Sequence, residues 1–459
     1  MRPALTFPYR LALLACSVLV GLNLLPDAFA VFLTAAVVGV VALRLGLVPT
    51  LVAVAVLGLP FLHALASLIG LTPTVLVMGL DVILLVLVSA ASPALLSLPA
   101  YKGVRRFLVW WFVFLAIYSI FSFTAELSDY SIFTWQYLAV YGSYYALAGV
   151  LAVRHEITPS EAMAVGLPLF AFNYPLLHAS IISVSTIADA TIGLRGSGAF
   201  DPITGARAAG LLLLMALAVI CAGRRNQRWV PEIVVAIVCG APLAWYAYTR
   251  QVYVAAALVA LWMLAAMVFG PRVQGESLGR RLATLAVMCL LATLAVSYAL
   301  QLLGSNMHSR IAEHGLQSDR ADLWLTSLRL IASSPISGIG IGEFQRAGYG
   351  LWPHNWIIEA WLALGLPGLI LTAIGAGVVV AALFRRSERW LSGWLFLALY
   401  YLLVAQVSAD IARNAPLLFF IVLAFHATCG PAHRAGLSQR KGHSRLMRLG
   451  SFQPGTLRW

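Results

Sequence analysis

The chain has 459 residues, of which 61% are hydrophobic and only 10% are charged, and its mean hydropathy is +0.90. A soluble globular domain carries about 25% charged residues, so the composition excludes a soluble protein and indicates an integral membrane protein. The net charge of +13 does not predict a nucleic-acid partner, because no stacking aromatic residues are interleaved with the basic ones on a soluble domain.

Apolar runs recur along the chain at lengths suited to helices of about 20 residues, which cross a hydrocarbon core of roughly 30 Å. They are too long for the strands of a membrane barrel. The pattern predicts about fourteen spans, centred near residues 18, 36, 58, 82, 115, 143, 173, 215, 240, 260, 292, 370, 399 and 422. Pro26, Pro49 and Pro60 interrupt the first four spans, so two short spans there could form one re-entrant element.

The distribution of Lys and Arg predicts the topology, because basic residues that flank membrane spans are retained in the cytoplasm. With a cytoplasmic N-terminus, the basic segments on that side include 101–106, 154–156, 224–228, 271–281, 385–389 and the C-terminal tail. Only eight of the 30 basic residues then fall on the outer face, namely Arg195, Arg207, Arg250, Arg310, Arg320, Arg329, Arg346 and Arg413. We therefore expect both termini in the cytoplasm.

Motifs for metal or nucleotide chemistry are missing from the sequence. The five cysteines lie in or beside apolar runs without a Cys-x-x-Cys pair. His-Glu-x-x-His and Asp-x-Asp motifs are also absent, which argues against a zinc protease and a metal-dependent sugar-nucleotide transferase. The sequence predicts no metal, no cofactor and no nucleotide partner.

Three arginines of the outer face are candidates for binding an anion. Arg195 lies in the glycine-containing stretch LRGSGAF, Arg250 lies at a tight connection between two spans, and Arg320 lies in a long polar segment. A guanidinium group near a bilayer is costly unless it is paired or reaches the interface, and its planar fork matches phosphate oxygens. They could instead reach lipid headgroups or pair with Asp189, Asp201 or Asp410. The other five outer arginines are interpreted as solvated or headgroup charges.

The polar segment 304–354 is the longest on the outer face. Ser318 can cap a helix that runs to Ser334, where Pro335 stops it. Its stripe of Leu323, Trp324, Ser327, Leu328 and Ile331 predicts a helix that lies on an apolar surface and holds Arg320 over the membrane face. Gly338, Gly340 and Gly342 follow, and we interpret them as a tight turn with close backbone packing rather than a phosphate cradle.

His354 and Asn355 stand at the start of a predicted span. An imidazole can take a proton from a hydroxyl group at neutral pH, although a single histidine is more often a hydrogen-bonded structural residue. Pro353 fixes the entry to the span, Asn355 can orient a ring or a sugar hydroxyl, and Glu359 lies one turn along the same helix face. These neighbours make His354 a candidate base.

The stretch from Arg320 to Gly368 resembles the signature region of the O-antigen ligase and polymerase-like superfamily. That pattern consists of Arg320, Trp324, Pro335, Gly338, Gly340, Gly342, His354, Asn355, Gly365 and Gly368. Upstream, RGSGAFDP at 195–202 is similar to an Arg-x-Ser-Gly-x-Phe segment of the family. TRQVY at 249–253 is similar to its Ser-Arg-Gly turn, with Thr249 and Gln251 in place of the usual residues. The resemblance covers roughly residues 190 to 385.

The resemblance implies an all-α polytopic membrane protein, GT-C-like, with about 12–14 transmembrane helices and a helical periplasmic loop. We expect four regions, which are the N-terminal spans at 1–303, the periplasmic loop at 304–354, the C-terminal spans at 355–430 and a basic cytoplasmic tail at 431–459. The implied location is the bacterial inner membrane, with both termini in the cytoplasm and the active site on the periplasmic face.

The activity that the resemblance implies is a metal-independent, inverting glycosyltransfer in lipopolysaccharide biosynthesis. An undecaprenyl (polyprenyl) diphosphate carrier donates the glycan, and a sugar hydroxyl of lipid A-core accepts it. Arg195, Arg250 and Arg320 would bind the diphosphate, His354 would be catalytic, and Asn355 and Glu359 would orient the substrate.

Three other functions remain open from the sequence. The first is a polymerase that uses the same donor and a second lipid-linked glycan as acceptor. The second is a transporter or flippase for lipid-linked glycans, which commonly has repeat symmetry and a polar path near the bilayer midplane. The third is a structural membrane scaffold, which would leave His354 and the outer arginines unexplained.

Overall fold

The computed structural model describes most of the predicted bundle. The described residues are 7–21, 27–71, 73–124, 129–172, 202–221, 230–246, 250–269, 279, 286, 319–349, 352–385, 389–407 and 411–429. The predicted span centred near residue 173 is described only as far as residue 172. The centre of the predicted span near residue 292, the loop residues 304–318 and the predicted tail 431–459 lie outside the described part of the chain.

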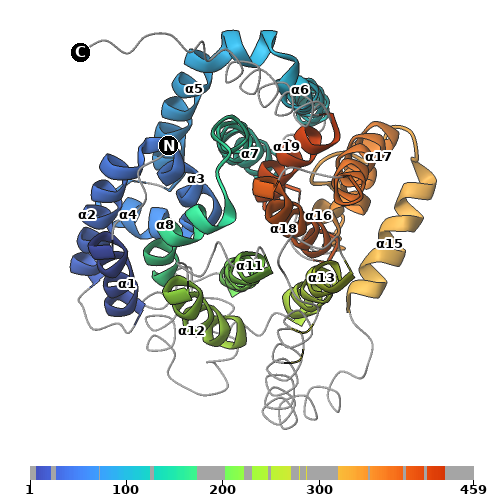
Figure 1. The fold of residues 1–459 in the computed structure, drawn as a ribbon. Helices are drawn as coiled ribbons and strands as arrows, with labels where there is room; N and C mark the ends of the chain where they lie inside the picture. The colour runs from blue at the N-terminus through green and yellow to red at the C-terminus, as the bar shows by residue number, and fades with distance from the viewer. Residues whose placement is uncertain are drawn as a thin grey trace, which may run out of the picture.

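Every regular element in the described part is a helix. The α-helices are α1 Phe7–Gly21, α2 Asp27–Leu45, α3 Leu47–Leu57, α4 Leu59–Leu68, α5 Pro73–Ser97, α6 Lys102–Thr124, α7 Asp129–His155, α8 Pro159–Ala171, α11 Pro202–Cys221, α12 Val230–Tyr246, α13 Arg250–Phe269, α15 Asp319–Ser333, α16 Glu343–Arg346, α17 Trp356–Leu383, α18 Arg389–Ala405 and α19 Pro416–Cys429. A short 3-10 helix, Pro99–Tyr101, precedes α6. The predicted all-α class is confirmed (Figure 1).

Several helices are apolar enough to cross a membrane. The stretches Lys102–Ser122, Thr204–Cys221 and Trp356–Leu383 are also at least 18 residues long, and shorter apolar helices accompany them. Large hydrophobic side chains point outwards, as Phe112 and Leu261 do on α6 and α13. In water such a surface would be an aggregation hazard, whereas lipid solvates it. The chain is therefore a multi-pass membrane protein.

The predicted span near residue 58 is two short helices rather than one. Helix α3 ends at Leu57, and the N–H of Gly58 donates to the carbonyl of Val54 over 2.9 Å. Pro60 follows in the first turn of α4, where its missing N–H costs nothing, whereas within a continuous helix its ring would clash with the preceding turn. The break near Pro60 therefore follows from proline chemistry.

Helix α19 lies at the centre of the bundle and contacts α6, α7, α17 and α18 (Figure 1). Its residues 417–425 are all buried. A helix that is hydrophobic on every side is stable only when other elements surround it. The core of the bundle is built around this helix.

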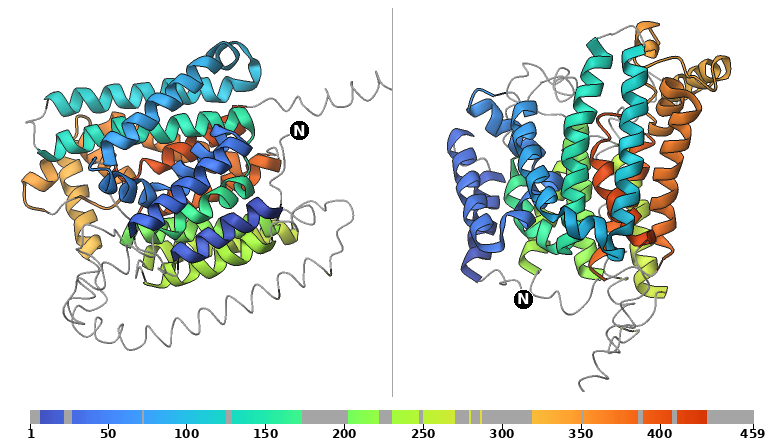
Figure 2. Two further views of the ribbon diagram at one scale, coloured as in Figure 1. Left: turned by 90° about the vertical axis from the view of Figure 1, so that its left-hand side faces the viewer. Right: turned by 90° about the horizontal axis from the view of Figure 1, so that it is seen from above.

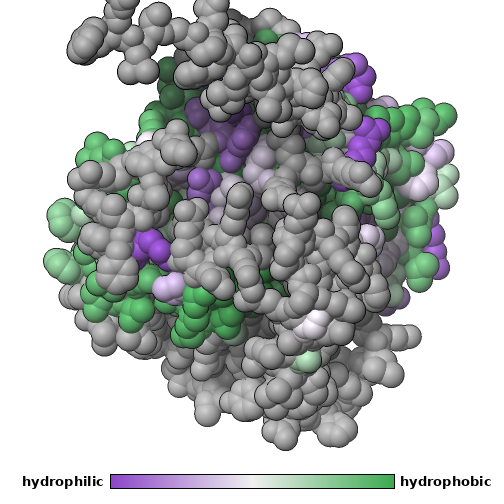
Figure 3. All heavy atoms as spheres, in the orientation of Figure 1, coloured by the Kyte–Doolittle hydropathy of each residue, from purple (hydrophilic) through white to green (hydrophobic). Residues whose placement is uncertain are grey.

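The helix ends define two ends of the molecule. Arg106 at the start of α6 donates to Cys429 Sγ at the end of α19 over 3.2 Å, and Arg385 beyond α17 donates to the carbonyl of Thr428. We call this the basic end, and the first residues of α1 lie at the same end (Figure 2, left). Figure 3 looks onto it and shows hydrophilic residues in the upper middle and hydrophobic ones along both sides.

The opposite end, which we call the site end, carries the start of α17, the end of α18 and the start of α19. Helix α15 runs across this end instead of along the bundle (Figure 2, left). Polar side chains join the elements here, because Asn355 Nδ2 donates to the carbonyl of Gln406 over 2.9 Å. The two ends of the bundle thus differ in architecture.

Candidate functional site

Helix α15 occupies the position predicted for the loop helix, ending at Ser333 just before Pro335. Ser327 and Ile331 are buried as expected, and Ile331 joins a small apolar cluster with residues of α16 and α17. Leu328 is 43% exposed, so its predicted place on the buried stripe is wrong. The buried face turns towards the first turns of α17, and Leu330 joins the cluster there instead.

The glycine-containing segment after α15 docks onto a break in α17. Gly365 interrupts α17 with φ 64° and ψ −151°. The N–H groups of Ile339 and Gly340 donate to the carbonyls of Leu362 and Ala363 over 2.8 and 3.2 Å. The expected close backbone packing is confirmed. It also disfavours a phosphate cradle, since these two N–H groups already bind α17.

Two of these glycines leave no room for a side chain. A Cβ on Gly365 would lie 2.0 Å from the carbonyl oxygen of Ile336, and one on Gly338 would lie 2.5 Å from the nitrogen of Gly365. Both residues also have positive φ angles, which glycine adopts without a steric cost. The spaced glycines of the sequence therefore interlock the loop with α17, directly beyond the residues that carry the candidate chemistry.

Asn355 is the N-cap of α17. Its Oδ1 accepts hydrogen bonds from the N–H groups of Ile357 and Ile358 over 3.0 and 2.9 Å, while Nδ2 donates to Gln406. These bonds satisfy donors that a helix start leaves unpaired. Asn355 thus fixes the start of α17 and ties it to the end of α18. Its predicted contact with substrate stays a prediction.

Glu359 is buried, and its Oε2 accepts a hydrogen bond from the N–H of Ile411 over 3.1 Å. Ile411 begins the turn that leads into α19. Glu359 therefore positions the backbone of this turn. Its predicted contact with substrate stays a prediction.

His354 stands between the loop and α17 with a φ of 58°, which is uncommon for a residue other than glycine. Its Nδ1 accepts a hydrogen bond from the indole Nε1–H of Trp352 over 2.9 Å. The two rings meet edge to face, with centroids 5.4 Å apart. Because an indole N–H can only donate, Nδ1 is unprotonated in this arrangement.

A cation lies over the face of the same indole. The guanidinium carbon of Arg413 is 4.7 Å from the centroid of the Trp352 ring, within the range of a cation–π interaction. Sequence reasoning missed both Trp352 and Arg413. The available signal was an aromatic residue two positions before the candidate base and an arginine in a short polar connection between two apolar helices.

Arg207 also departs from its interpretation as a solvated or headgroup charge. It is only 5% exposed, and its Nη1 donates to the carbonyl of Arg413 over 3.3 Å. Tyr400 donates its hydroxyl to the carbonyl of Arg207 over 3.0 Å. Arg207 is buried because the first turns of α11 pack inside the bundle against α18. This packing places Arg207 next to the turn that carries Arg413.

The three arginines predicted to bind the diphosphate are described only in part. Arg250 is the first residue of α13 and Arg320 is the second residue of α15. Their side chains, and Arg195 as a whole, lie outside the described part of the structure. The predicted convergence of these guanidinium groups on His354 stays a prediction. Trp324, one turn after Arg320, donates its indole N–H to the carbonyl of Pro353 over 2.8 Å, so α15 touches the residue before His354.

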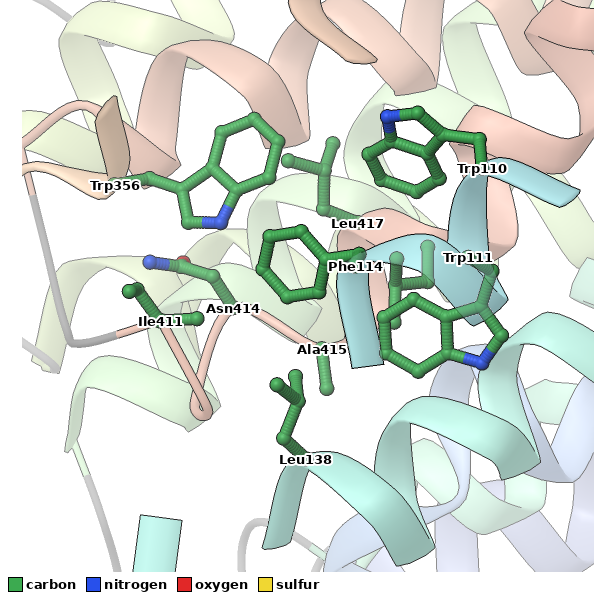
Figure 4. A pocket seen from close by; sticks show the side chains of 10 residues that line it. Trp110, Trp111, Phe114, Leu138, Trp356, Ile411, Asn414, Ala415 and Leu417 are labelled. Atoms are coloured by element: carbon green, nitrogen blue, oxygen red, sulfur yellow. The ribbon is translucent and has the colours of Figure 1, made fainter. Parts of the chain in front are cut away.

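An apolar pocket lies beside the site, between α6, α17 and the start of α19 (Figure 4). Its lining includes Trp110, Phe114, Trp356 and Asn414. The volume of about 10 Å³ is close to the minimum that holds one water molecule. The pocket is too small for a sugar ring, so we assign no substrate to it.

The fold and the site together define a polytopic membrane protein with a polar site at one end of its bundle. Residues 243–373 match the family described as O-Antigen ligase. This part of the chain is therefore similar to the O-antigen ligase family, a family of enzymes whose substrates are lipid-linked glycans in general. The matched range includes Arg250, Arg320 and the His354–Asn355 pair. None of the curated proteins compared with the chain matches it.

Proposed function

We propose that the protein is an O-antigen ligase of the bacterial inner membrane. It transfers a glycan from an undecaprenyl diphosphate carrier to a sugar hydroxyl of lipid A-core, with inversion and without a metal ion. The observation that carries this proposal is the family match over residues 243–373. The gathering of His354, Trp352 and Arg413 at the site end supports it.

The proposed orientation of the protein in the membrane rests on the arginines of the basic end. Arg105, Arg106 and Arg385 lie at the basic end, which the positive-inside rule places in the cytoplasm. The site end then faces the periplasm. Of the four proposed regions of the chain, the loop at 304–354 contains α15 and α16, and the spans at 355–430 contain the central helix α19.

The charge of the leaving group sets the main chemical task of the site. Arg195, Arg250 and Arg320 bind the diphosphate in this proposal, and Arg413 is the cation that lies beside the Trp352–His354 pair. Charge stabilisation where charge develops is commonly the largest catalytic term. A diphosphate is a sufficiently weak base to leave without a general acid.

In the transfer step, the acceptor oxygen forms a bond to the anomeric carbon from the face opposite the diphosphate. The bond between that carbon and the diphosphate oxygen breaks, and its electron pair stays on the diphosphate. The proton of the acceptor hydroxyl passes to His354. A positioned base of this kind contributes on the order of 100- to 10,000-fold to the rate.

The test uses purified protein in lipid nanodiscs with a polyprenyl-diphosphate glycan and lipid A-core. We expect glycan on lipid A-core and release of polyprenyl diphosphate, both lost in His354→Ala. His155→Ala, at the opposite end of α7 from the site, is the matched control and keeps the activity. Glycan elongation on the carrier alone would show a polymerase, and transport without donor consumption would show a flippase. Either outcome overturns the ligase proposal.

A further inference from the structure

Trp352 contacts two charged or ionisable groups at once, the imidazole of His354 through its N–H and the guanidinium of Arg413 through its ring face. Building on the proposed transferase, we propose that Trp352 is a positioning residue of the site. Its indole N–H keeps the proton of neutral His354 on Nε2 and occupies Nδ1, the base nitrogen, until the acceptor hydroxyl takes its place.

The position of the proton follows from the donors and acceptors. An indole nitrogen donates and cannot accept, so the bond of 2.9 Å requires a lone pair on Nδ1 of His354. A neutral imidazole carries one proton, which must then lie on Nε2. The imidazolium form and the other tautomer would both set two N–H groups against each other. This contact therefore selects one of three protonation states.

That state decides which nitrogen can act as the base. In this tautomer only Nδ1 carries a lone pair that can accept a proton. The acceptor hydroxyl must therefore reach Nδ1 and displace the indole N–H. One hydrogen bond to Nδ1 replaces another in this exchange. As the new glycosidic bond forms, the O–H bond breaks and Nδ1 gains the proton, and the imidazolium later releases a proton to water. Trp352 can donate to Nδ1 again only after that release.

The surroundings hold the backbone of His354 in place during the exchange. The carbonyl of Pro353 accepts the indole N–H of Trp324 over 2.8 Å, and Asn355 is fixed by its cap bonds and by Gln406. Both neighbours of His354 are therefore tied to helices. The indole is itself buried and carries Arg413 on its face. The exchange then needs side-chain rotation without movement of the backbone.

Nitrogen-15 NMR of the full-length protein in nanodiscs, labelled on histidine, tests the proton position directly. The His354 signals are assigned by their loss in His354→Gln. We expect an unprotonated Nδ1 and a protonated Nε2 in the wild type, and a mixture of tautomers in Trp352→Phe. Trp361→Phe is the matched control, since it removes an indole N–H that donates to the carbonyl of Pro335 over 3.1 Å, and it leaves the His354 signals unchanged.

A protonated Nδ1 in the wild type, or an unchanged spectrum in Trp352→Phe, overturns the proposal. The wild-type spectrum alone decides the first point, even if a variant does not fold. Since the spectra need no turnover, they fail or succeed independently of the transfer assay for the ligase.

A kinetic experiment tests the displacement. If the indole competes with the acceptor for Nδ1, Trp352→Phe lowers the KM for the acceptor by about two- to tenfold, the equivalent of one net hydrogen bond. The KM for the donor stays unchanged, because phenylalanine keeps an aromatic face for Arg413. A higher acceptor KM in Trp352→Phe would count against displacement of the indole by the hydroxyl.

Discussion

His354 combines a strained backbone with a chemically defined side chain. Its φ of 58° costs a non-glycine residue on the order of 1 kcal/mol. Such strain persists where neighbouring contacts fix the conformation, and it is common at functional sites. Here the residue with the positive φ also accepts the hydrogen bond from Trp352, two residues earlier. The backbone strain and the hydrogen bond that selects the base nitrogen thus both occur at His354.

Glycine and alanine at position 354 separate this strain from the chemistry. Both variants remove the imidazole, so we expect both to lose 100- to 10,000-fold in transfer rate. His354→Gly tolerates the positive φ, and it should be more stable than His354→Ala by about 1 kcal/mol. Thermal unfolding of the two variants in the same detergent measures the difference. Equal stability, or a more stable alanine variant, would show that the backbone is not strained at this position.

At the scale of elements, the site depends on the interlock between the loop after α15 and the broken helix α17. Breaking α17 at Gly365 exposes the carbonyls of Leu362 and Ala363, and the loop supplies their N–H partners. The N–H of Leu366 in turn donates to the carbonyl of Ile336 over 3.0 Å. Backbone groups in a membrane protein must find such partners inside the protein. The interlock therefore provides hydrogen-bond partners for the backbone groups at the break in α17. It also fixes the loop that leads to His354.

Gly365→Ala tests the interlock without touching a reacting group. The added Cβ would lie 2.0 Å from the carbonyl oxygen of Ile336 at a positive φ, so we expect a loss of more than about 2 kcal/mol of stability. Transfer activity should fall with it as the loop leaves α17. Gly377→Ala on the same helix is the control, because its Cβ meets nothing within 4 Å and alanine favours a helix. Unfolding curves and protease cleavage between α15 and α17 report the two effects.

Local patterns in the sequence predicted several elements correctly for physical reasons. Pro335 and the spacing of Ser327 and Ile331 predicted the end and the buried face of α15. The prediction for Leu328 was wrong because α15 lies across the end of the bundle. It packs there against only a few turns of α17, and not against a broad apolar surface. The alternating glycines predicted close backbone packing, but their partner, the break at Gly365, lies beyond the His-Asn pair.

The contacts that define the site could not be predicted in the same way. Trp352 and Arg413 are separated in the sequence by the whole of α17 and α18, and no periodicity links them. From the sequence, Asn355 was predicted to orient a ring or a sugar hydroxyl, and its role as the N-cap of α17 was not predicted. Its cap bonds come from the N–H groups of Ile357 and Ile358. These contacts depend on tertiary placement, which residue type and spacing do not contain.

At the scale of the whole molecule, the basic end and the site end lie at opposite ends of the same helices. The basic end joins α6, α17 and α19 through arginine contacts, and the bidentate pair of Arg10 and Glu232, at 2.5 and 2.6 Å, ties α1 to α12. Arginine-rich helix ends are held in the cytoplasm. The polar site lies at the far end of the same helices, so the sidedness of the basic end determines the compartment in which the site works.

Labelling of single cysteines in intact cells checks this orientation. In a variant without the native cysteines, Ser333→Cys lies at the end of α15 and Lys102→Cys at the start of α6, and both positions are exposed. A membrane-impermeant thiol reagent added from the periplasm should label Ser333→Cys and spare Lys102→Cys until the cells are lysed. The reverse pattern would place the site in the cytoplasm and remove it from a periplasmic acceptor.

The central position of α19 has a consequence for biogenesis. The ribosome makes this helix after all four of the helices that surround it. Until α19 inserts, the faces of those four helices that later contact it have no protein partner and are in contact with lipid. Native packing is therefore completed late in synthesis. A nascent chain that stalled before residue 416 would lack the central helix, and membrane quality control would recognise it as misfolded.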